Sequence, residues 1–295
     1  MIKVSPKLVK KAFPIRSGKK YFKKYDFGLL LVIGGSDFYS GSPALNALAG
    51  FRVGVGMVRI LAPKRAADII ASFSPDLAAF PLEGKWLLKE HLPILLTMTK
   101  SAIEVAYGNV ACVIGGGLGR TKETQETVIE YVKNVNIPLV IDADAIYALA
   151  KAPEIFANKP ILFTPHGFEF FVLTGTKIDE DLPLKKKVEI VKKSAEKLKT
   201  TILYKTKPDI ITDGKKVFLN YAGTPFLAVG GTGDTLAGIC GALMARKIEP
   251  LLAGAIGAYL NGRAGEIAAE KLREGLLATD VINHLPEAIK EIFQN

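Results

Sequence analysis

Cysteine is scarce in this sequence, with Cys112 and Cys240 the only two among 295 residues. Each lies in an apolar run, which is typical of a buried thiol and not of a disulfide framework. A cytoplasmic location is therefore the default expectation. No stretch of about 18 uncharged apolar residues occurs, so we expect no membrane-spanning helix. The first residues also lack the apolar core of a secretory signal.

Two familiar nucleotide-binding motifs are missing as well. No G-x-x-x-x-G-K-[ST] occurs, which excludes a P-loop enzyme. The glycines at 54–56 and at 115–119 do not complete G-x-G-x-x-G, so a Rossmann dinucleotide site is disfavoured. The three histidines are far apart, and no Cys/His spacing suits zinc.

Acidic residues are absent from the first 25 positions. This stretch holds nine of the 39 Lys and Arg residues, and the remaining 30 face 29 acids. The net charge of +10 therefore belongs to an N-terminal arm. We predict a basic extension at 1–26, solvated or in contact with a partner, and one catalytic domain at 27–295. Binding to nucleic acid is disfavoured, because the rest of the chain is nearly neutral.

Short apolar runs alternate with longer segments of helical periodicity. Strands are predicted at 28–33, 58–61, 110–114, 139–142, 161–164 and 201–204. A hairpin is predicted at 210–211 and 216–219, on either side of Asp213-Gly214. Helices are predicted at 43–53, 124–134, 168–173, 184–198, 235–246, 251–272 and 278–291. This alternation predicts an α/β fold, a three-layer sandwich with a mainly parallel central sheet and helices on both faces.

Polar or glycine-rich segments follow five of the predicted strands. They occupy 34–43, 115–120, 142–145, 164–169 and position 205. The carboxyl ends of parallel strands meet at one edge of a sheet, which is where ligands bind in such folds. We therefore expect these segments to form the rim of one pocket.

The segment 230–234 reads Gly-Gly-Thr-Gly-Asp and precedes an apolar helical segment. Glycines and the unpaired N–H groups of a first helical turn make a site for phosphate. The carboxylate of Asp234 would repel that phosphate. Its position is explained if it acts as a base and takes a proton from a hydroxyl that attacks the phosphoryl group. The alternative is an ordinary helix N-cap, and the segment alone does not decide between the two.

Four further polar residues on the predicted rim are candidates for the site. Asp142 and Asp144 end a strand two residues apart, which suits magnesium and phosphate chemistry; the alternative is one N-cap and one exposed acid. His166 either contacts a ligand or makes an ordinary hydrogen bond in its loop. Lys205 ends an apolar strand, where a phosphate partner or an exposed strand end would explain its ammonium group.

Five segments, taken in order, resemble the ADP/ATP-dependent NAD(P)H-hydrate dehydratases of the ribokinase-like superfamily. They are 33–43, 115–119, 142–145, 164–166 and the Gly-Gly-Thr-Gly-Asp segment at 230–234. The resemblance extends over about 28–286. It implies a ribokinase-like fold, a homotetramer, and a lyase that repairs the hydrated cofactors NADHX and NADPHX. ADP or ATP phosphorylates the hydrate hydroxyl, which Asp234 activates, and elimination of the phosphate restores the double bond. Magnesium is expected with the nucleotide.

The resemblance also implies which residues bind each substrate. Those implied for the hydrate are Ser42, Ala44, Gly117, Gly119, His166 and Asp234. Those implied for the nucleotide and its phosphates are Lys205, Thr206, Lys207, Pro208, Asp209, Gly231, Thr232 and Gly233. No metal ligand is assigned, and Asp142 and Asp144 remain the candidates.

The chain departs from the family pattern on the nucleotide side. Thr206 stands where a glycine usually follows the strand-end lysine, the segment 223–228 differs from the usual sequence, and Asn261 replaces a frequent histidine. The preference for ADP or ATP is therefore not carried over. Two rival functions are a small-molecule kinase of the same superfamily, acting on a sugar, hydroxymethylpyrimidine or hydroxyethylthiazole, and a nucleotide-binding scaffold without catalysis.

Overall fold

One ten-stranded sheet organises the computed structural model, which describes residues 1–14 and 21–294. Its strand order is β1-β10-β9-β8-β7-β6-β5-β2-β3-β4. The strands are β1 Ile2–Lys3, β2 Leu29–Ile33, β3 Met57–Pro63, β4 Ala79–Leu82, β5 Val110–Ile114, β6 Leu139–Ile141, β7 Ile161–Phe163, β8 Thr201–Tyr204, β9 Asp209–Thr212 and β10 Val217–Asn220. Every neighbouring pair is parallel except those of β9, which is antiparallel to both β8 and β10. The carboxyl ends of β2, β5 to β8 and β10 therefore share one edge.

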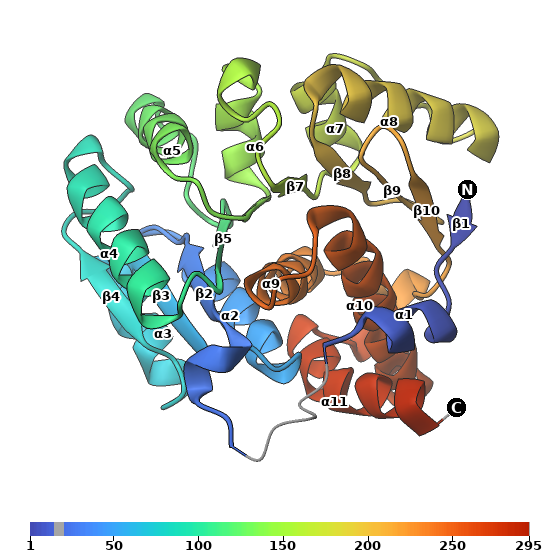
Figure 1. The fold of residues 1–295 in the computed structure, drawn as a ribbon, viewed down its shortest axis with the longest axis horizontal. Helices are drawn as coiled ribbons and strands as arrows, with labels where there is room; N and C mark the ends of the chain where they lie inside the picture. Colours follow the sequence, from blue (N-terminus) through green and yellow to red (C-terminus); the bar gives the residue numbers. More distant parts are fainter. Residues whose placement is uncertain (15–20, 295) are drawn as a thin grey trace.

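Helices cover both faces of this sheet, as Figure 1 shows. The helices on the first face are α1 Pro6–Ala12, α2 Gly41–Arg52, α3 Lys64–Phe73, α9 Thr232–Ala245, α10 Pro250–Leu272 and α11 Ala278–Gln294. The helices on the second face are α4 Leu92–Val105, α5 Lys122–Asn134, α6 Asp144–Leu149, α7 Gly167–Thr174 and α8 Leu184–Leu198. Short 3₁₀ turns are η1 Lys24–Phe27, η2 Lys89–His91, η3 Pro153–Ile155, η4 Pro225–Leu227 and η5 Arg273–Gly275.

The apolar side chains of β2 show why helices are needed on both faces. Leu30 and Val32 join the core cluster of the first face, while Leu29, Leu31 and Ile33 join that of the second. Successive side chains of a strand point to opposite faces, so an unbroken apolar strand must be covered twice.

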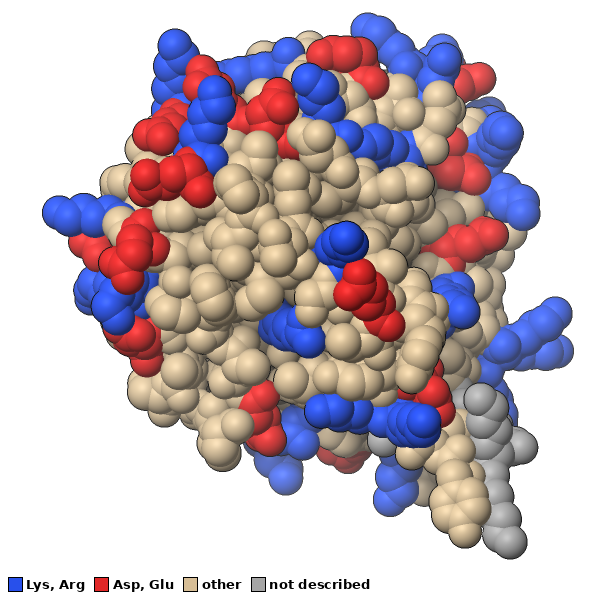
Figure 2. Space-filling model, turned by 60° about the vertical axis from the view of Figure 1, so that its left-hand side comes forward, with Lys and Arg blue, Asp and Glu red and all other residues tan. Residues whose placement is uncertain are grey.

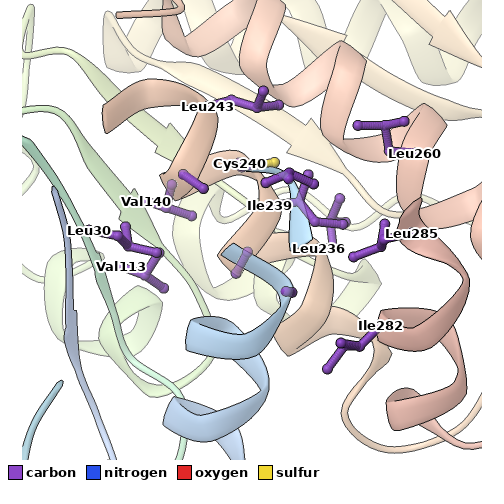
Figure 3. Packing of buried hydrophobic residues seen from close by; sticks show 14 of the residues in the cluster. Leu30, Val113, Val140, Leu236, Ile239, Cys240, Leu243, Leu260, Ile282 and Leu285 are labelled. Carbon is purple, nitrogen blue, oxygen red and sulfur yellow. The ribbon is translucent and has the colours of Figure 1, made fainter. Parts of the chain in front are cut away.

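Helix α9 lies at the centre of the first face and carries the Gly-Gly-Thr-Gly-Asp segment at its start. Figure 3 shows its side chains between the sheet and the helices α10 and α11, with Leu30, Val113 and Val140 on the strand side. A β-carbon at Gly238 would lie 2.2 Å from the carbonyl oxygen of Asn46. The absence of a side chain there lets α9 approach α2 closely, which brings the N-terminal ends of the two helices together.

The predicted fold class is confirmed, and the helix α8 and the strands β5 and β8 begin and end where predicted. Helices α3, α4 and α6 and the edge strand β4 were not predicted. The buried residues of α4 are Leu95, Thr99 and Ala102, three or four positions apart as on one face of a helix. Apolar residues between them hide this spacing in the sequence. Within the described residues, no helix is long and apolar enough to cross a membrane.

The N-terminal segment packs on the rest of the chain where the structure describes it. Strand β1 pairs with β10, and Val4, Val9 and Phe13 join the core of the first face. The lysines of this segment are exposed, as predicted from their charge. Arg16, Lys19 and Lys20 lie outside the described residues, and the domain boundary at 26 stays a prediction.

The surface outside this segment carries both signs of charge. On the face of Figure 2, Lys and Arg side chains are interspersed with Asp and Glu side chains around a central area of other residues. This mixture fits the near balance of charges predicted for the remainder of the chain.

Candidate functional site

The carboxyl edge of the sheet holds two hollows, the larger lined in part by the start of α9 and the smaller by the loops that follow β2 and β5. The larger is a cavity of about 660 Å³. Among the residues that line it are His166, Lys205, Thr206, Lys207, Asp209, Thr232 and Gly233. The smaller hollow, of about 290 Å³, is lined by Ser36, Phe38, Tyr39, Trp86, Gly117, Gly119 and Asp144. Most of the predicted site residues therefore lie at one edge, as the strand ends predicted.

Asp234 occupies the first turn of α9, but it does not cap the helix. The N-cap is Gly231, in the left-handed conformation with φ +96°, so the interpretation of Asp234 as an N-cap is wrong. Its carboxylate Oδ1 instead accepts a hydrogen bond from Ser42 Oγ of α2. Burial raises the pKa of Asp234 to about 6, and the negative charge of Asp142 adds to this rise.

Gly116 brings the loop after β5 against this pair. A β-carbon at position 116 would lie 1.7 Å from Ser42 Oγ and 2.9 Å from Asp234 Oδ1. The next residue, Gly117, lines the smaller hollow, whereas Gly233 lines the larger cavity. Asp234 therefore lies next to residues of both hollows, although it is in the lining of neither.

Lys205 already has protein partners beside the phosphate site. Its Nζ lies 3.2 Å from Asp142 Oδ1 and 3.7 Å from Glu169 Oε2, and its side chain is 21% exposed. Burial lowers the pKa of Lys205, but these carboxylates outweigh it and the net change is upward. A β-carbon on Gly233 would lie 3.4 Å from Nζ, so the ammonium group stands next to the first turn of α9.

His166 is the N-cap of α7 as well as part of the cavity wall. Its Nδ1 accepts a hydrogen bond from Phe168 N at 3.2 Å, and Nε2 lies 3.4 Å from Glu169 Oε1. The side chain is 53% exposed. Both interpretations of His166 therefore remain compatible with its position, because a capping side chain can still face a ligand.

The two candidate acids after β6 point to different partners. Strand β6 ends at Ile141, one residue before the predicted end, so neither acid belongs to the strand. Asp142 accepts a hydrogen bond from Thr164 and pairs with Lys205. Asp144 accepts from Gly119 N at 2.9 Å and from Arg120 Nε at 2.7 Å.

A half-buried acid that lines the larger cavity, Asp209, was predicted only as a nucleotide contact. It accepts hydrogen bonds from Thr206 N at 3.1 Å and from Asn220 Nδ2 at 3.0 Å. Burial raises its pKa to about 6 in spite of these bonds and of the nearby charge of Lys205. Asp209 can therefore change its charge near neutral pH inside the cavity.

Five predicted binding residues are outside the groups that line the two hollows: Ser42 and Asp234, described above, and Ala44, Pro208 and Gly231. Ala44 is 3% exposed and belongs to the core beneath the site. Pro208 stands between two lining residues, and Gly231 precedes the lining pair at the start of α9. Their roles, like those of the other predicted contacts, stay predictions.

Several polar and aromatic residues at the site were missed. Asn46 donates to the carbonyl oxygen of Asp234 at 2.9 Å, and Asn261 accepts from Thr235 Oγ1 at 2.6 Å. Tyr39 and Trp86 line the smaller hollow. Asn46 lies four residues after Ser42, one helical turn along α2, and this spacing could have indicated it.

The residues present do not form a dedicated metal cage. Among residues 1–14 and 21–294, no group of three or more His, Cys, Asp and Glu side chains is placed to hold a metal ion. Magnesium, however, often enters on substrate phosphates with one or two carboxylates and several waters. The acid Asp142 beside Lys205 fits that kind of site.

Solved structures confirm the class of fold. A ribokinase-like superfamily protein from Enterococcus faecalis superposes with a TM-score of 0.82 at 24% identity, over 99% of this chain and 96% of that one. The ADP/ATP-dependent NAD(P)H-hydrate dehydratase from Bacillus subtilis, co-crystallised with ATP and Mg²⁺, gives 0.81 at 25% identity, over 99% and 98%. The fold is therefore ribokinase-like, as predicted.

Sequence comparison then identifies the family. The family model for NAD(P)H-hydrate dehydratase matches residues 30–287. The ADP-dependent (S)-NAD(P)H-hydrate dehydratase of Nitrosopumilus maritimus is 31% identical over 289 residues, covering 96% of this chain and 95% of that protein. The chain belongs to the NAD(P)H-hydrate dehydratase family, which confirms the resemblance seen in the sequence.

Other relatives are longer proteins. The bifunctional NAD(P)H-hydrate repair enzyme of Pyrobaculum aerophilum is 40% identical over 270 residues, covering 91% of this chain but 52% of that protein. The chain thus spans about half the length of the first curated relatives it matches, which share this bifunctional name.

Proposed function

We propose that this protein converts hydrated NAD(P)H back to NAD(P)H with ADP or ATP as co-substrate. The observation that carries the proposal is the place of Asp234, a half-buried carboxylate in the first turn of α9, next to Gly233 of the larger cavity and against Gly116, whose neighbour Gly117 lines the smaller hollow. The family to which the chain belongs supports this activity over that of a sugar or vitamin-precursor kinase.

The larger cavity would take the nucleotide. The first turn of α9 offers unpaired N–H groups for its phosphates, and Lys205 beside Gly233 adds a positive charge. Magnesium would accompany these phosphates and neutralise charge during transfer. The names of the N. maritimus and B. subtilis relatives support ADP or ATP in this role.

The smaller hollow would take the hydrated nicotinamide ring. Its aromatic walls, Tyr39 and Trp86, suit a flat ring, and they pack closely against Gly117 and Gly119. The hydrate hydroxyl would then lie within reach of Asp234, which Ser42 orients through its hydrogen bond.

The chemistry divides into two steps. The hydroxyl oxygen bonds to the terminal phosphorus of the nucleotide, its proton passes to Asp234, and the bond between that phosphorus and the nucleotide breaks. The carbon–oxygen bond of the phosphorylated hydrate then breaks. Inorganic phosphate leaves, and a proton is lost from the neighbouring ring carbon, which restores the double bond.

The experiment mixes the protein with NADHX or NADPHX, magnesium, and ADP or ATP, and follows the near-ultraviolet absorbance of the reduced nicotinamide. We expect recovery of NAD(P)H that depends on the nucleotide. Asp234→Asn should lower turnover by about a hundredfold or more, the scale of a lost general base, with an unchanged circular dichroism spectrum. Accumulation of a stable phosphorylated product without NAD(P)H would favour the kinase.

A homotetrameric assembly and a cytoplasmic location accompany this proposal as predictions. The implied tetramer is checked by light scattering of the purified protein. The buried thiols of Cys112 and Cys240 support a reducing compartment.

A further inference from the structure

We propose that Glu266 positions the outer wall of the larger cavity through the backbone of Gly223, and so sets how tightly the nucleotide binds. The inference rests on the proposed function because it assumes that the nucleotide binds in that cavity. It concerns α10 and α11, which lie outside the reacting centre at Asp234.

The wall in question is the segment 220–224 that follows β10. All five of its residues line the larger cavity. Gly223 adopts a φ of +130°, which residues with a side chain rarely reach. A segment of this kind needs outside contacts to hold one conformation, because it lies after the end of the sheet.

Both backbone groups of Gly223 are held by charged side chains. Its N–H donates to Glu266 Oε1 at 2.7 Å, and its carbonyl oxygen accepts from Lys207 Nζ at 3.0 Å. Hydrogen bonds of this type are stronger than those between neutral groups. Lys207 is itself one of the predicted nucleotide contacts, so Glu266 and Lys207 hold the same residue from opposite sides.

Glu266 is in turn held by Arg263 of the same helix, which also binds Glu291 of α11. Arg263 lies 2.9 Å from Glu266 Oε2, and the same guanidinium forms two bonds to Glu291 of α11, at 2.7 and 3.0 Å. Hydrogen bonding to Arg263 lowers the pKa of Glu291. The two acids share one cation in a planar arrangement, which restricts the side chain of Glu266 more than a single surface pair does.

Helix α10 also touches the wall directly. A β-carbon at Gly262 would lie 2.5 Å from the carbonyl oxygen of Ala222, and one at Gly265 would lie 2.5 Å from Leu227. The wall therefore rests on the surface of α10 with no side chain between them at Gly262. A displacement of α10 would move the cavity wall with it.

The test measures nucleotide affinity by calorimetry, with magnesium and ADP or ATP but without the hydrate. Glu266→Ala removes the acceptor for Gly223 and should weaken binding about tenfold. Glu266→Gln keeps a carbonyl oxygen for that N–H, and binding should stay within about twofold of the unaltered protein. Glu270→Ala, at an exposed acid one turn further along α10, is the matched control and should bind normally.

A positioning role predicts a particular kinetic pattern. In the repair assay, the KM for the nucleotide should rise in Glu266→Ala, while kcat at saturating nucleotide stays within about twofold. Thermal unfolding of each variant separates this effect from a loss of stability, since a structural role alone would lower Tm without changing the affinity of the folded protein.

Normal nucleotide affinity in Glu266→Ala, or equal losses in Glu266→Ala and Glu270→Ala, would overturn the proposal. If Glu266→Ala does not fold, Arg263→Gln decides instead: it frees Glu266 from its anchor and should weaken binding about threefold, and normal binding would overturn the inference. Failure of the unaltered protein to bind any adenine nucleotide would overturn the proposed function and this inference together. If the protein binds the nucleotide but does not repair the hydrate, the proposed function fails, and the nucleotide affinities of the variants still decide this inference.

Discussion

At the scale of single residues, the raised pKa of Asp234 makes activity depend on pH. The carboxylate must be ionised to accept a proton, and burial, reinforced by the charge of Asp142, raises its pKa to about 6. We expect kcat/KM for the hydrate to be level above this value and to fall about tenfold per pH unit below it. The measurement is a pH profile of initial rates at saturating nucleotide, since Asp209 in the nucleotide cavity titrates in the same range. A profile that stays level down to pH about 4, the ordinary range of an aspartate, would contradict the assignment.

The same shift has the opposite effect on stability. An acid whose pKa is higher in the native protein than the ordinary value of 3.8 binds its proton more tightly when folded. The contribution of Asp234 to stability is therefore largest below that ordinary value and is lost as the pH rises through about 6. If Asp234 is the proposed base, keeping its carboxylate ionised at neutral pH costs some stability, as at other functional sites.

Gly116 offers a second prediction at this scale. Gly116→Ala would place a methyl group against Ser42 Oγ and Asp234 Oδ1, so the pair must separate or the loop must move. We expect at least about a hundredfold loss of kcat, comparable with loss of the base itself, because a base acts only within hydrogen-bond reach. The control is Gly275→Ala, where a β-carbon meets nothing within 4 Å and activity should not change. Equal activity of the two variants would show that the Ser42–Asp234 contact is not needed.

Most of the residues that line the two hollows at the carboxyl edge of the sheet could be located from the ends of the predicted strands, but their contacts could not. Asp234 and Lys205 follow local rules, since one starts a helix after glycines and the other ends an apolar strand. The hydrogen bond from Ser42 to Asp234 joins positions 192 residues apart, and the pair of Lys205 with Asp142 joins positions 63 apart. Such pairings depend on how the elements pack, which no local pattern contains.

At the scale of elements, the N-terminal helix α1 is part of the core. Val9 is fully buried, and α1 packs against α10 and α11. Val9→Ala should lower the free energy of unfolding by about 2 kcal/mol, from the lost methyl groups and the space they leave. Lys10→Ala, on the exposed side of the same helix, should change it by less than about 0.5 kcal/mol. Chemical denaturation measures both, and equal values would show that α1 does not contribute to the stability of the fold.

The two strands that were missed, β4 and β1, lie at the two edges of the sheet. Strand β4 is short, contains Pro81 and lies at the edge of the sheet, so its sequence lacks the usual features of a strand. Strand β1 has only two residues, and its pairing with β10 is a tertiary contact. The buried central strands were predicted well because both their faces are apolar and turn residues bound them.

At the scale of the whole molecule, nucleotide binding should stabilise the folded state. A ligand present at a hundred times its Kd adds about 2.7 kcal/mol to the free energy of unfolding if it binds only the native protein. We expect magnesium with ADP or ATP to raise Tm by about 5 °C or more. Adenosine is the control, because it lacks the phosphates that the start of α9 would hold. An equal rise with adenosine would place the main contacts away from Lys205 and Gly233.

The pairing of β1 with β10 also constrains the order of folding. Ile2 lies opposite Phe218, so the first strand of the chain has no partner until residues near 218 have been made. Contacts between such distant positions form late, because the chain between them must be ordered first. During synthesis the N-terminal segment would therefore stay unpaired and accessible to proteases and chaperones while the central strands assemble. In the finished protein, its backbone amides should be among the first to exchange with solvent.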